Sequence, residues 1–301
     1  MKRLFVFGCS FTNYDWPTWA DMLSLEFEYF ENWAMPGLGN RAIAERLAEC
    51  HVKNNINEDD TVIVQWSSHI RQDWYKDIFN EEENSTEGWA VHYTSKYYIE
   101  HKKYIDKIFS EKSAVLHTLN MIGLAQSLLN STKCTWLMTS LGDIRNLGYD
   151  NAFNKRGGIT FIDDEIKEMA KDRTEWLIWK KFPEFKIYEN LWNNDKWIEP
   201  LFKTVKENKN KIWRFEKNNY VDLHPTPFMH NQWINQKLKL KLDIDYNYDT
   251  DREFVATKLE LLKDSGHYSS EEFFDLVDAL LARIVNEKGI ALPDKHKLIG
   301  F

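Results

Sequence analysis

The chain has few of the residues that cross-link or interrupt a polypeptide. Its 301 residues include only 3 cysteines, 12 glycines and 7 prolines. Three cysteines are an odd number and too few for the disulfide framework of a small secreted protein. Glycine and proline are too scarce to form a linker, and no apolar run approaches the ~20 residues that cross a bilayer.

Positive charge is also in short supply. Lysine and arginine total 39 against 47 aspartates and glutamates, which leaves a formal net charge of −8. This balance argues against a protein that binds a nucleic-acid backbone, because such binding needs a basic surface. The apolar run at residues 4–8 is too short for a signal peptide. We therefore expect a cytoplasmic protein without nucleic-acid or membrane partners; its oligomeric state is left open.

Aromatic residues, in contrast, are abundant. Phenylalanine, tryptophan and tyrosine make up 15% of the chain, and 13 residues are tryptophan. Tryptophan in this quantity suits stacking on sugar rings or bases. It also suits a core built from large aromatic side chains, which is the interpretation we favour.

An alternation of strands and helices runs through the first half of the chain. Short apolar segments predict strands at residues 2–7, 28–34, 61–66 and 134–139. Apolar residues at helical spacing predict helices that start near residues 15–17 and cover residues 41–52 and 97–129. This repetition is typical of a parallel sheet covered by helices on both faces, a three-layer α/β/α fold.

The second half of the chain is less regular. Residues 141–210 are rich in tryptophan, and we interpret them as a helical insertion or lid packed over the sheet edge. A fifth strand is predicted at residues 211–215 and an amphipathic helix at residues 270–287. The predicted organisation is one α/β domain at residues 1–240, with a C-terminal helical extension at residues 241–301 packed on it.

Two adjacent candidate nucleophiles follow the first predicted strand. Gly8 tolerates the dihedral angles of a sharp turn, and such a turn exposes the hydroxyl of Ser10 for attack. The same residues also suit an ordinary turn in which Ser10 bonds its own backbone. Cys9 is the alternative nucleophile, although neighbouring side chains diverge and only one can face a shared base.

A candidate base lies more than two hundred residues further along the chain. Pro225 restricts the backbone of His224, and the carboxylate of Asp222 can fix the tautomer of the imidazole. One alternative is a surface Asp–His pair in a proline-rich turn. A metal site of Asp222, His224 and His230 is a further alternative, although no other His/Cys cluster accompanies these three residues. We predict neither a metal nor another cofactor.

A third group of residues precedes the helix predicted at residues 41–52. Gly37 and Gly39 expose backbone N–H groups there, and the positive end of the helix dipole adds to them. Such amides suit an oxyanion formed in acyl transfer. The alternative is a tight turn between a strand and a helix.

Taken in chain order, these groups resemble the SGNH (GDSL-type) hydrolases, a family of esterases, lipases and carbohydrate acetylesterases. The family has a nucleophile block Gly-Asp-Ser, then an asparagine five residues before an oxyanion-binding glycine, and finally His-Pro with a second histidine six residues on. The matching residues are Gly8-Cys9-Ser10, Asn32 with Gly37, and His224-Pro225 with His230. The resemblance covers residues 1–75 and 215–240 and implies a flavodoxin-like central sheet.

The chain departs from the family at three places. Cys9 replaces an aspartate outside the triad, and Asp222 stands two residues before His224 instead of three. The third departure concerns the block after the third strand, where the family supplies an oxyanion-binding asparagine. The residues at this block that could donate instead are Ser67, Ser68, His69 and Arg71.

The resemblance implies a serine ester hydrolase that removes a small acyl group, for which we expect a carbohydrate or glycan substrate. Ser10 would be the nucleophile, His224 the base and Asp222 its orienting carboxylate, while Gly37 and Asn40 would bind the oxyanion or substrate together with the block after the third strand. Arg71 also suits an anionic substrate or a surface salt bridge. Two alternatives stay open: a catalytically silent module that binds a glycan or a protein partner, and an acyltransferase.

Overall fold

The structure is a computed structural model of the chain that describes residues 2–14, 18–69, 71–76, 88–93, 107, 110–147, 177–201, 225, 227–244 and 246. Within these ranges no helix combines the length and the apolar character that a membrane span requires. The elements in chain order are β1 (Arg3–Phe7), α1 (Trp19–Leu23), η1 (Ser24–Glu26), β2 (Tyr29–Asn32), α2 (Asn40–Asn54), β3 (Asp60–Trp66), β4 (Arg71–Lys76), β5 (Gly88–Tyr93), α4 (Glu111–Thr132), β6 (Thr135–Ser140), α7 (Ile178–Lys181), η3 (Pro183–Trp192), α9 (Pro227–Trp233), η5 (Ile234–Leu238) and α10 (Lys239–Leu242).

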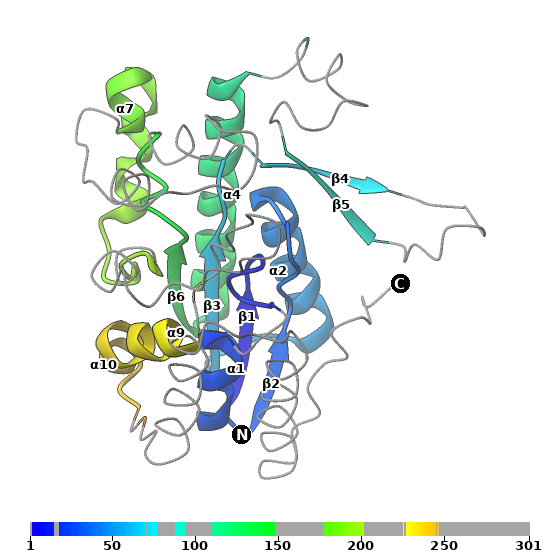
Figure 1. The fold of residues 1–301 in the computed structure, drawn as a ribbon, viewed down its shortest axis with the longest axis vertical. Helices are drawn as coiled ribbons and strands as arrows, with labels where there is room; N and C mark the ends of the chain where they lie inside the picture. Colours follow the sequence, from blue (N-terminus) through cyan, green and yellow to red (C-terminus); the bar gives the residue numbers. More distant parts are fainter. Residues whose placement is uncertain are drawn as a thin grey trace, which may run out of the picture.

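Four parallel strands form the central sheet in the order β2-β1-β3-β6 (Figure 1). At the carboxyl edge the register pairs Phe7 with Val64 and Trp66 with Ser140. This order is that of a flavodoxin-like sheet, in which ligands bind beyond the carboxyl ends of the strands. The predicted fold class is confirmed, and all four predicted strands are present within one or two residues of their expected bounds.

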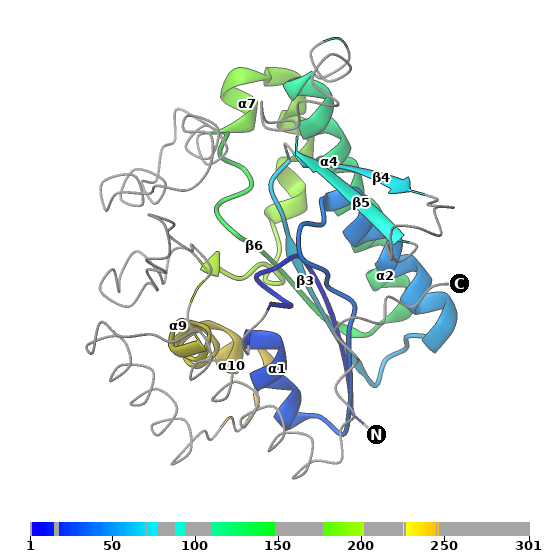
Figure 2. The same ribbon diagram turned by 45° about the vertical axis from the view of Figure 1, so that its right-hand side comes forward.

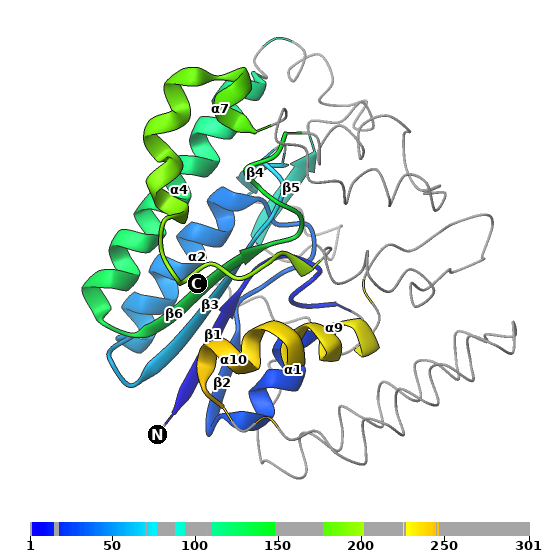
Figure 3. The same ribbon diagram turned by 90° about the vertical axis from the view of Figure 1, so that its left-hand side faces the viewer.

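Helices cover both faces of the sheet. α2 and α4 pack on one face, and α1 lies with α9 and α10 on the other (Figure 3). The predicted apolar stripe of α2, made of Ile43, Leu47 and Cys50, is fully buried. On the opposite face the rings of Trp19 in α1 and Trp233 in α9 meet edge to face, with centroids 5.6 Å apart. The sheet is therefore buried on both sides, as a parallel sheet requires.

A chain segment from the predicted insertion lies along the free edge of β6. Trp197 forms a parallel bridge with Met138, whose carbonyl accepts a 2.8 Å bond from the amide of Ile198. The preceding η3 packs on α4, where Phe185 joins Val115 in a second apolar cluster. This part of the insertion therefore extends the core beyond the last strand.

An antiparallel hairpin was not predicted from the sequence. β4 and β5 pair from Arg71 with Tyr93 to Lys76 with Gly88, and the hairpin lies next to α2 (Figure 2). Arg71, which the sequence places in the block after the third strand, therefore begins a strand of its own. The strand was missed because its sequence, Arg-Gln-Asp-Trp-Tyr-Lys, lacks the apolar run that marked the buried strands.

Capping contacts mark the first turns of α1 and α4. α1 begins at Trp19, and the amide of Thr18 before it donates to Asp21 Oδ2 over 2.8 Å, as in a capping box. α4 begins at Glu111, where Ser110 accepts the amide of Ser113. The predicted features at residues 15–17, 211–215, 270–287 and most of residues 97–110 and 148–176 lie outside the described residues.

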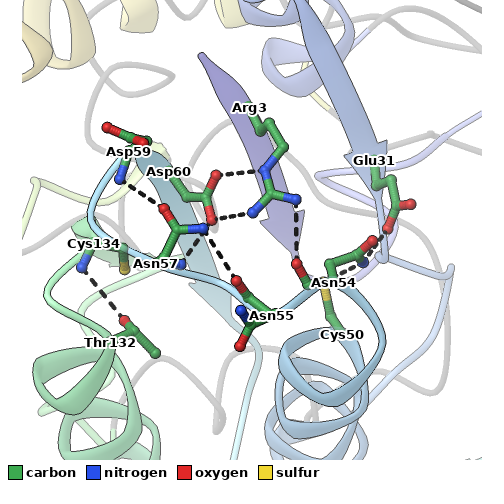
Figure 4. Close-up of polar contacts among 10 residues, drawn as sticks. All are labelled: Arg3, Glu31, Cys50, Asn54, Asn55, Asn57, Asp59, Asp60, Thr132 and Cys134. Carbon is green, nitrogen blue, oxygen red and sulfur yellow. Dashed lines mark hydrogen bonds and ion pairs between the residues drawn. The ribbon is translucent and has the colours of Figure 1, made fainter. Parts of the chain in front are cut away.

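At the amino edge of the sheet, where the strands begin, an ion pair joins β1 to β3 (Figure 4). Arg3 Nε and Nη2 donate to the two oxygens of Asp60, each over 2.6 Å, and Nη1 donates to the carbonyl of Asn54 at the end of α2. The bond to Asp60 raises the pKa of Arg3. These contacts join two strands and a helix, at the edge opposite to the candidate site.

Candidate active site

The turn after β1 carries Ser10. The carbonyl of Cys9 accepts bonds from the amides of Thr12 and Asn13, at 2.8 and 3.1 Å, which closes the turn. Gly8 is required here, because a Cβ on it would lie 2.1 Å from Thr12 Oγ1. Ser10 is 6% exposed and Cys9 is fully buried in the apolar core. The turn is thus tight, as the Gly8-Cys9-Ser10 motif predicted, but it leaves Ser10 buried instead of exposing its hydroxyl.

Side-chain bonds fasten this turn to both neighbouring strands. The carbonyl of Thr12 accepts from Asn32 Nδ2 at the end of β2 and from Thr18 Oγ1, at 3.0 and 2.7 Å. The hydroxyl of Thr12 donates to Gln65 Oε1 in β3. Asn32, which the family resemblance singled out, therefore acts here by bonding the backbone of the nucleophile turn.

The turn around Gly37 lies beside the nucleophile turn. The amide of Met35 donates to the carbonyl of Gly8 over 3.4 Å, and the amide of Leu38 donates to Met35. Gly37 has a φ of 87°, in the left-handed region that favours glycine. The structure therefore brings together two of the three predicted groups, at the carboxyl edge of the sheet.

A carboxylate that the sequence analysis did not single out caps α2. Asp73 in β4 accepts the amide of Gly39 at Oδ1 over 2.7 Å and the amide of Ala42 at Oδ2 over 2.9 Å. Burial raises the pKa of Asp73, and the two amide bonds oppose this shift. A signal existed: Gly39 stands at the N-cap position of α2 and has no side chain to satisfy the free amides, so a remote acceptor is needed.

The block after β3 is buried and is held by Asn40. Asn40 Oδ1 accepts the amide of Ser67 over 2.7 Å, while its Nδ2 donates to the carbonyl of Ser67 and to Thr118 Oγ1. Ser67 is 2% exposed, and its hydroxyl has no hydrogen-bond partner among the described residues. Ser68 and His69 are buried as well. Asn40 thus orients Ser67 through the backbone.

Arg71 reaches back to the Gly37 turn. Its amide donates to the carbonyl of Ser68, and its Nη1 donates to the carbonyl of Leu38 over 3.1 Å. The side chain is half-buried. The guanidinium of Arg71 therefore contacts the backbone of the predicted oxyanion-binding turn.

Asp222 and His224, the predicted carboxylate and base, lie outside the described residues. Pro225, directly after His224, is described and buried. Met229 and His230 follow in α9 and are fully or almost fully buried, and α9 packs on α1, the helix after the Ser10 turn. The chain therefore returns to the face of the sheet that α1 covers, close in sequence to His224.

The tryptophans with described side chains serve packing. Trp33, Trp66 and Trp233 are 2% exposed or less. In the insertion, Trp192 and Trp197 are half-buried and contact each other, with ring centroids 5.6 Å apart. These contacts agree with the core interpretation of the aromatic content.

Acidic, histidine and cysteine side chains do not gather into a metal site in the part of the chain that the structure describes. The chemistry available at this edge is that of a serine hydroxyl, backbone amides, a buried histidine at position 69 and the Asp73 carboxylate. These are groups of acid–base and nucleophilic chemistry.

Comparisons with known proteins give a distant structural likeness. No family model matches the chain, and no curated protein matches it. Among solved structures it is similar to the crystal structure of protein YxiM from Bacillus subtilis, with 14% sequence identity and a TM-score of 0.41. The similarity covers 82% of this chain and 58% of YxiM.

Proposed function

We propose that the chain is a divergent SGNH-type serine ester hydrolase that removes a small acyl group from a carbohydrate or glycan. The observation that supports this most is the fixed turn of Ser10 beside the Gly37 turn, joined through the bond from Met35 to the carbonyl of Gly8. Acyl transfer needs a serine hydroxyl beside backbone amides that can donate to the oxyanion.

The proposed reaction has two steps. Ser10 Oγ attacks the ester carbonyl carbon and passes its proton to His224, which Asp222 orients. The tetrahedral intermediate collapses, His224 gives the proton to the leaving alcohol, and an acyl-serine remains. Water then attacks the acyl-serine, again with His224 as the base, which releases the acid and restores Ser10.

The oxyanion would be held by the amides of Ser10 and Gly37 together with the block after β3. The hydroxyl of Ser67 supports a donor role there, because it is buried and has no partner among the described residues. Ser68 and His69 are further candidates at the same block. Asn40 takes part by holding the backbone of Ser67.

Separate Ser10→Ala and His224→Ala variants test the assignment with short acyl esters and acetylated sugars. Each should lower kcat by ~1,000-fold or more. Ser131→Ala and His117→Ala, both on the surface of α4, are the matched controls and should keep wild-type turnover. Wild-type kcat in both site variants would overturn the triad.

A catalytically silent module that binds a glycan or protein is the second candidate. It is favoured by the asparagine missing after β3 and by the engagement of the Asn40 amide with Ser67 and Thr118. A silent module would retain sugar or protein binding while Ser10 fails to react with a serine-directed probe. An acyltransferase would share the acyl-serine and would give a new ester when an acceptor alcohol is added.

A further inference from the structure

Two side chains of β4 hold one peptide group beside Gly37 from both ends. Arg71 Nη1 donates to the carbonyl of Leu38 over 3.1 Å, and the amide of Gly39 donates to Asp73 Oδ1 over 2.7 Å. This carbonyl and this amide belong to the same planar peptide unit. Arg71 and Asp73 reach it together because residues two apart in a strand point to the same face. The orientation of the peptide plane is thereby fixed.

The carboxylate of Asp73 is buried and held in one orientation. It is 6% exposed, and each of its carboxylate oxygens accepts one backbone amide, from Gly39 and from Ala42. A neutral amide in its place could accept only one of these bonds and would turn N–H groups towards the other amide.

The lack of a side chain on Gly39 leaves room for the Asp73 carboxylate. Its φ of −93° and ψ of −178° are open to any residue, so its backbone does not require glycine. A Cβ on Gly39, however, would lie 2.7 Å from Asp73 Oδ2 and 2.8 Å from Oδ1. Glycine at this position is therefore explained by the contact with Asp73.

Gly37 lies between two anchored points of the backbone. On one side the amide of Met35 is bonded to the carbonyl of Gly8 in the nucleophile turn. On the other side the Leu38–Gly39 peptide is bonded to Arg71 and Asp73. With both flanks held, the peptide that carries the Gly37 amide has little freedom to rotate.

We infer that Asp73 and Arg71 are positioning residues for the oxyanion: they hold the Gly37 turn so that its amide faces the carbonyl that Ser10 attacks. The inference rests on the proposed esterase function. Neither side chain needs to touch the substrate. An error of ~1 Å in such a position can cost ~100-fold in rate.

Asp73→Asn is the first test, with kcat and KM measured separately on a neutral short acyl ester. We expect kcat to fall about 10- to 100-fold while KM stays within about twofold, because the amide acts on the transition state. Glu45→Gln, on the exposed side of α2, is the matched control and should keep wild-type kcat. Asp60→Asn, at the opposite edge of the sheet, controls for a general loss of stability.

Gly39→Ala tests the same contact from the side of the helix. In the wild-type background its methyl group displaces the Asp73 carboxylate, and kcat should fall to about the level of Asp73→Asn. In an Asp73→Ala background the methyl group has room, so Gly39→Ala should add less than about a twofold change. Full additivity of the two substitutions would contradict the contact as the cause.

Arg71→Met separates positioning from substrate binding. A positioning role predicts that kcat falls equally for neutral and anionic esters. A rise in KM confined to anionic esters would assign Arg71 to the substrate and remove it from the inference.

The outcomes distinguish the inference from the function on which it rests. Wild-type kcat in Asp73→Asn and Gly39→Ala, beside an active wild type, would overturn the positioning role alone. Losses of kcat no larger than that of Asp60→Asn would also overturn the positioning role. A wild type without turnover, whose Ser10 also fails to react with a serine-directed probe, would overturn the proposed function and this inference with it.

Discussion

The hydroxyl of Thr12 donates a 2.7 Å hydrogen bond to Oε1 of Gln65, which ties the turn that carries Ser10 to β3. Both side chains are fully buried. A Cβ on Gly8 would meet Thr12 Oγ1 at 2.1 Å and Gln65 Cβ at 3.3 Å, so the space around this bond is filled. The position of the candidate nucleophile is therefore set by packing and by a buried polar contact together.

Thr12→Val keeps the volume of the side chain and removes the hydroxyl. Among the described residues Gln65 Oε1 then keeps a 3.5 Å contact with Trp19 Nε1 alone, so we expect a loss of about 1–3 kcal/mol in the free energy of unfolding in urea. Turnover of short esters should fall as well. Thr139→Val is the control, since its buried hydroxyl makes only a 3.4 Å bond. Equal losses in both variants would contradict the importance of the Gln65 bond.

Asp60→Asn breaks the ion pair at the amino edge of the sheet (Figure 4). We expect a loss of ~3 kcal/mol in unfolding free energy, at the lower end of the range for a buried pair, because the Arg3 side chain is 22% exposed. The kcat should not change, since this edge lies opposite to the site. Arg41→Gln, which breaks an exposed pair with Glu45, should cost less than ~0.5 kcal/mol. A loss of kcat in folded Asp60→Asn would contradict this prediction.

We expect Asp73 to make the stability of the fold fall as pH rises, which is the opposite of the usual effect of a carboxylate. Burial raises its pKa in the folded state above its ordinary value, with a further contribution from Glu45, while the amides and Arg71 oppose it. The folded chain then binds the proton more readily than the unfolded chain. The contribution of Asp73 to stability is therefore largest at low pH and falls as pH rises from the ordinary pKa through the raised one.

Urea unfolding of wild type and Asp73→Asn across this pH range measures the effect. The stability of the wild type relative to the variant should decrease as pH rises. Glu45→Gln should move the decrease to lower pH, because it removes a charge that raises the pKa of Asp73. A difference that is independent of pH would contradict the prediction.

Cysteine modification separates the two candidate nucleophiles. Cys9, Cys50 and Cys134 are all buried, and burial raises the pKa of Cys50 and Cys134. We expect iodoacetamide to leave esterase activity intact and to alkylate the three thiols rapidly only after unfolding in urea. Loss of activity in step with alkylation of Cys9 would assign the nucleophile to Cys9.

Much of the fold could be predicted because its signals are local. The apolar run at Thr61–Trp66 and the stripe of Ile43, Leu47 and Cys50 fix a strand and a helix face by themselves, and both are buried as expected. The alternation of such segments then leads to a parallel sheet. The start of α1 was less predictable, since it depends on the capping pair Thr18 and Asp21.

The site was only partly predictable because its contacts join distant residues. The tight Gly8 turn and the left-handed Gly37 follow from local glycine chemistry. The cap from Asp73 to Gly39 spans 34 residues, and the N-cap glycine indicates a remote acceptor without identifying Asp73. The role of Asn40 in holding Ser67 depends likewise on the meeting of a helix with a strand end.

Labelling with a fluorophosphonate probe, followed by mass spectrometry of the adduct, tests the central claim most directly. We expect a covalent adduct on Ser10 that forms with the wild type, is lost in Ser10→Ala and is strongly slowed in His224→Ala, while Ser131→Ala labels normally. A folded wild-type protein that forms no adduct, or forms it on a residue other than Ser10, would contradict the account.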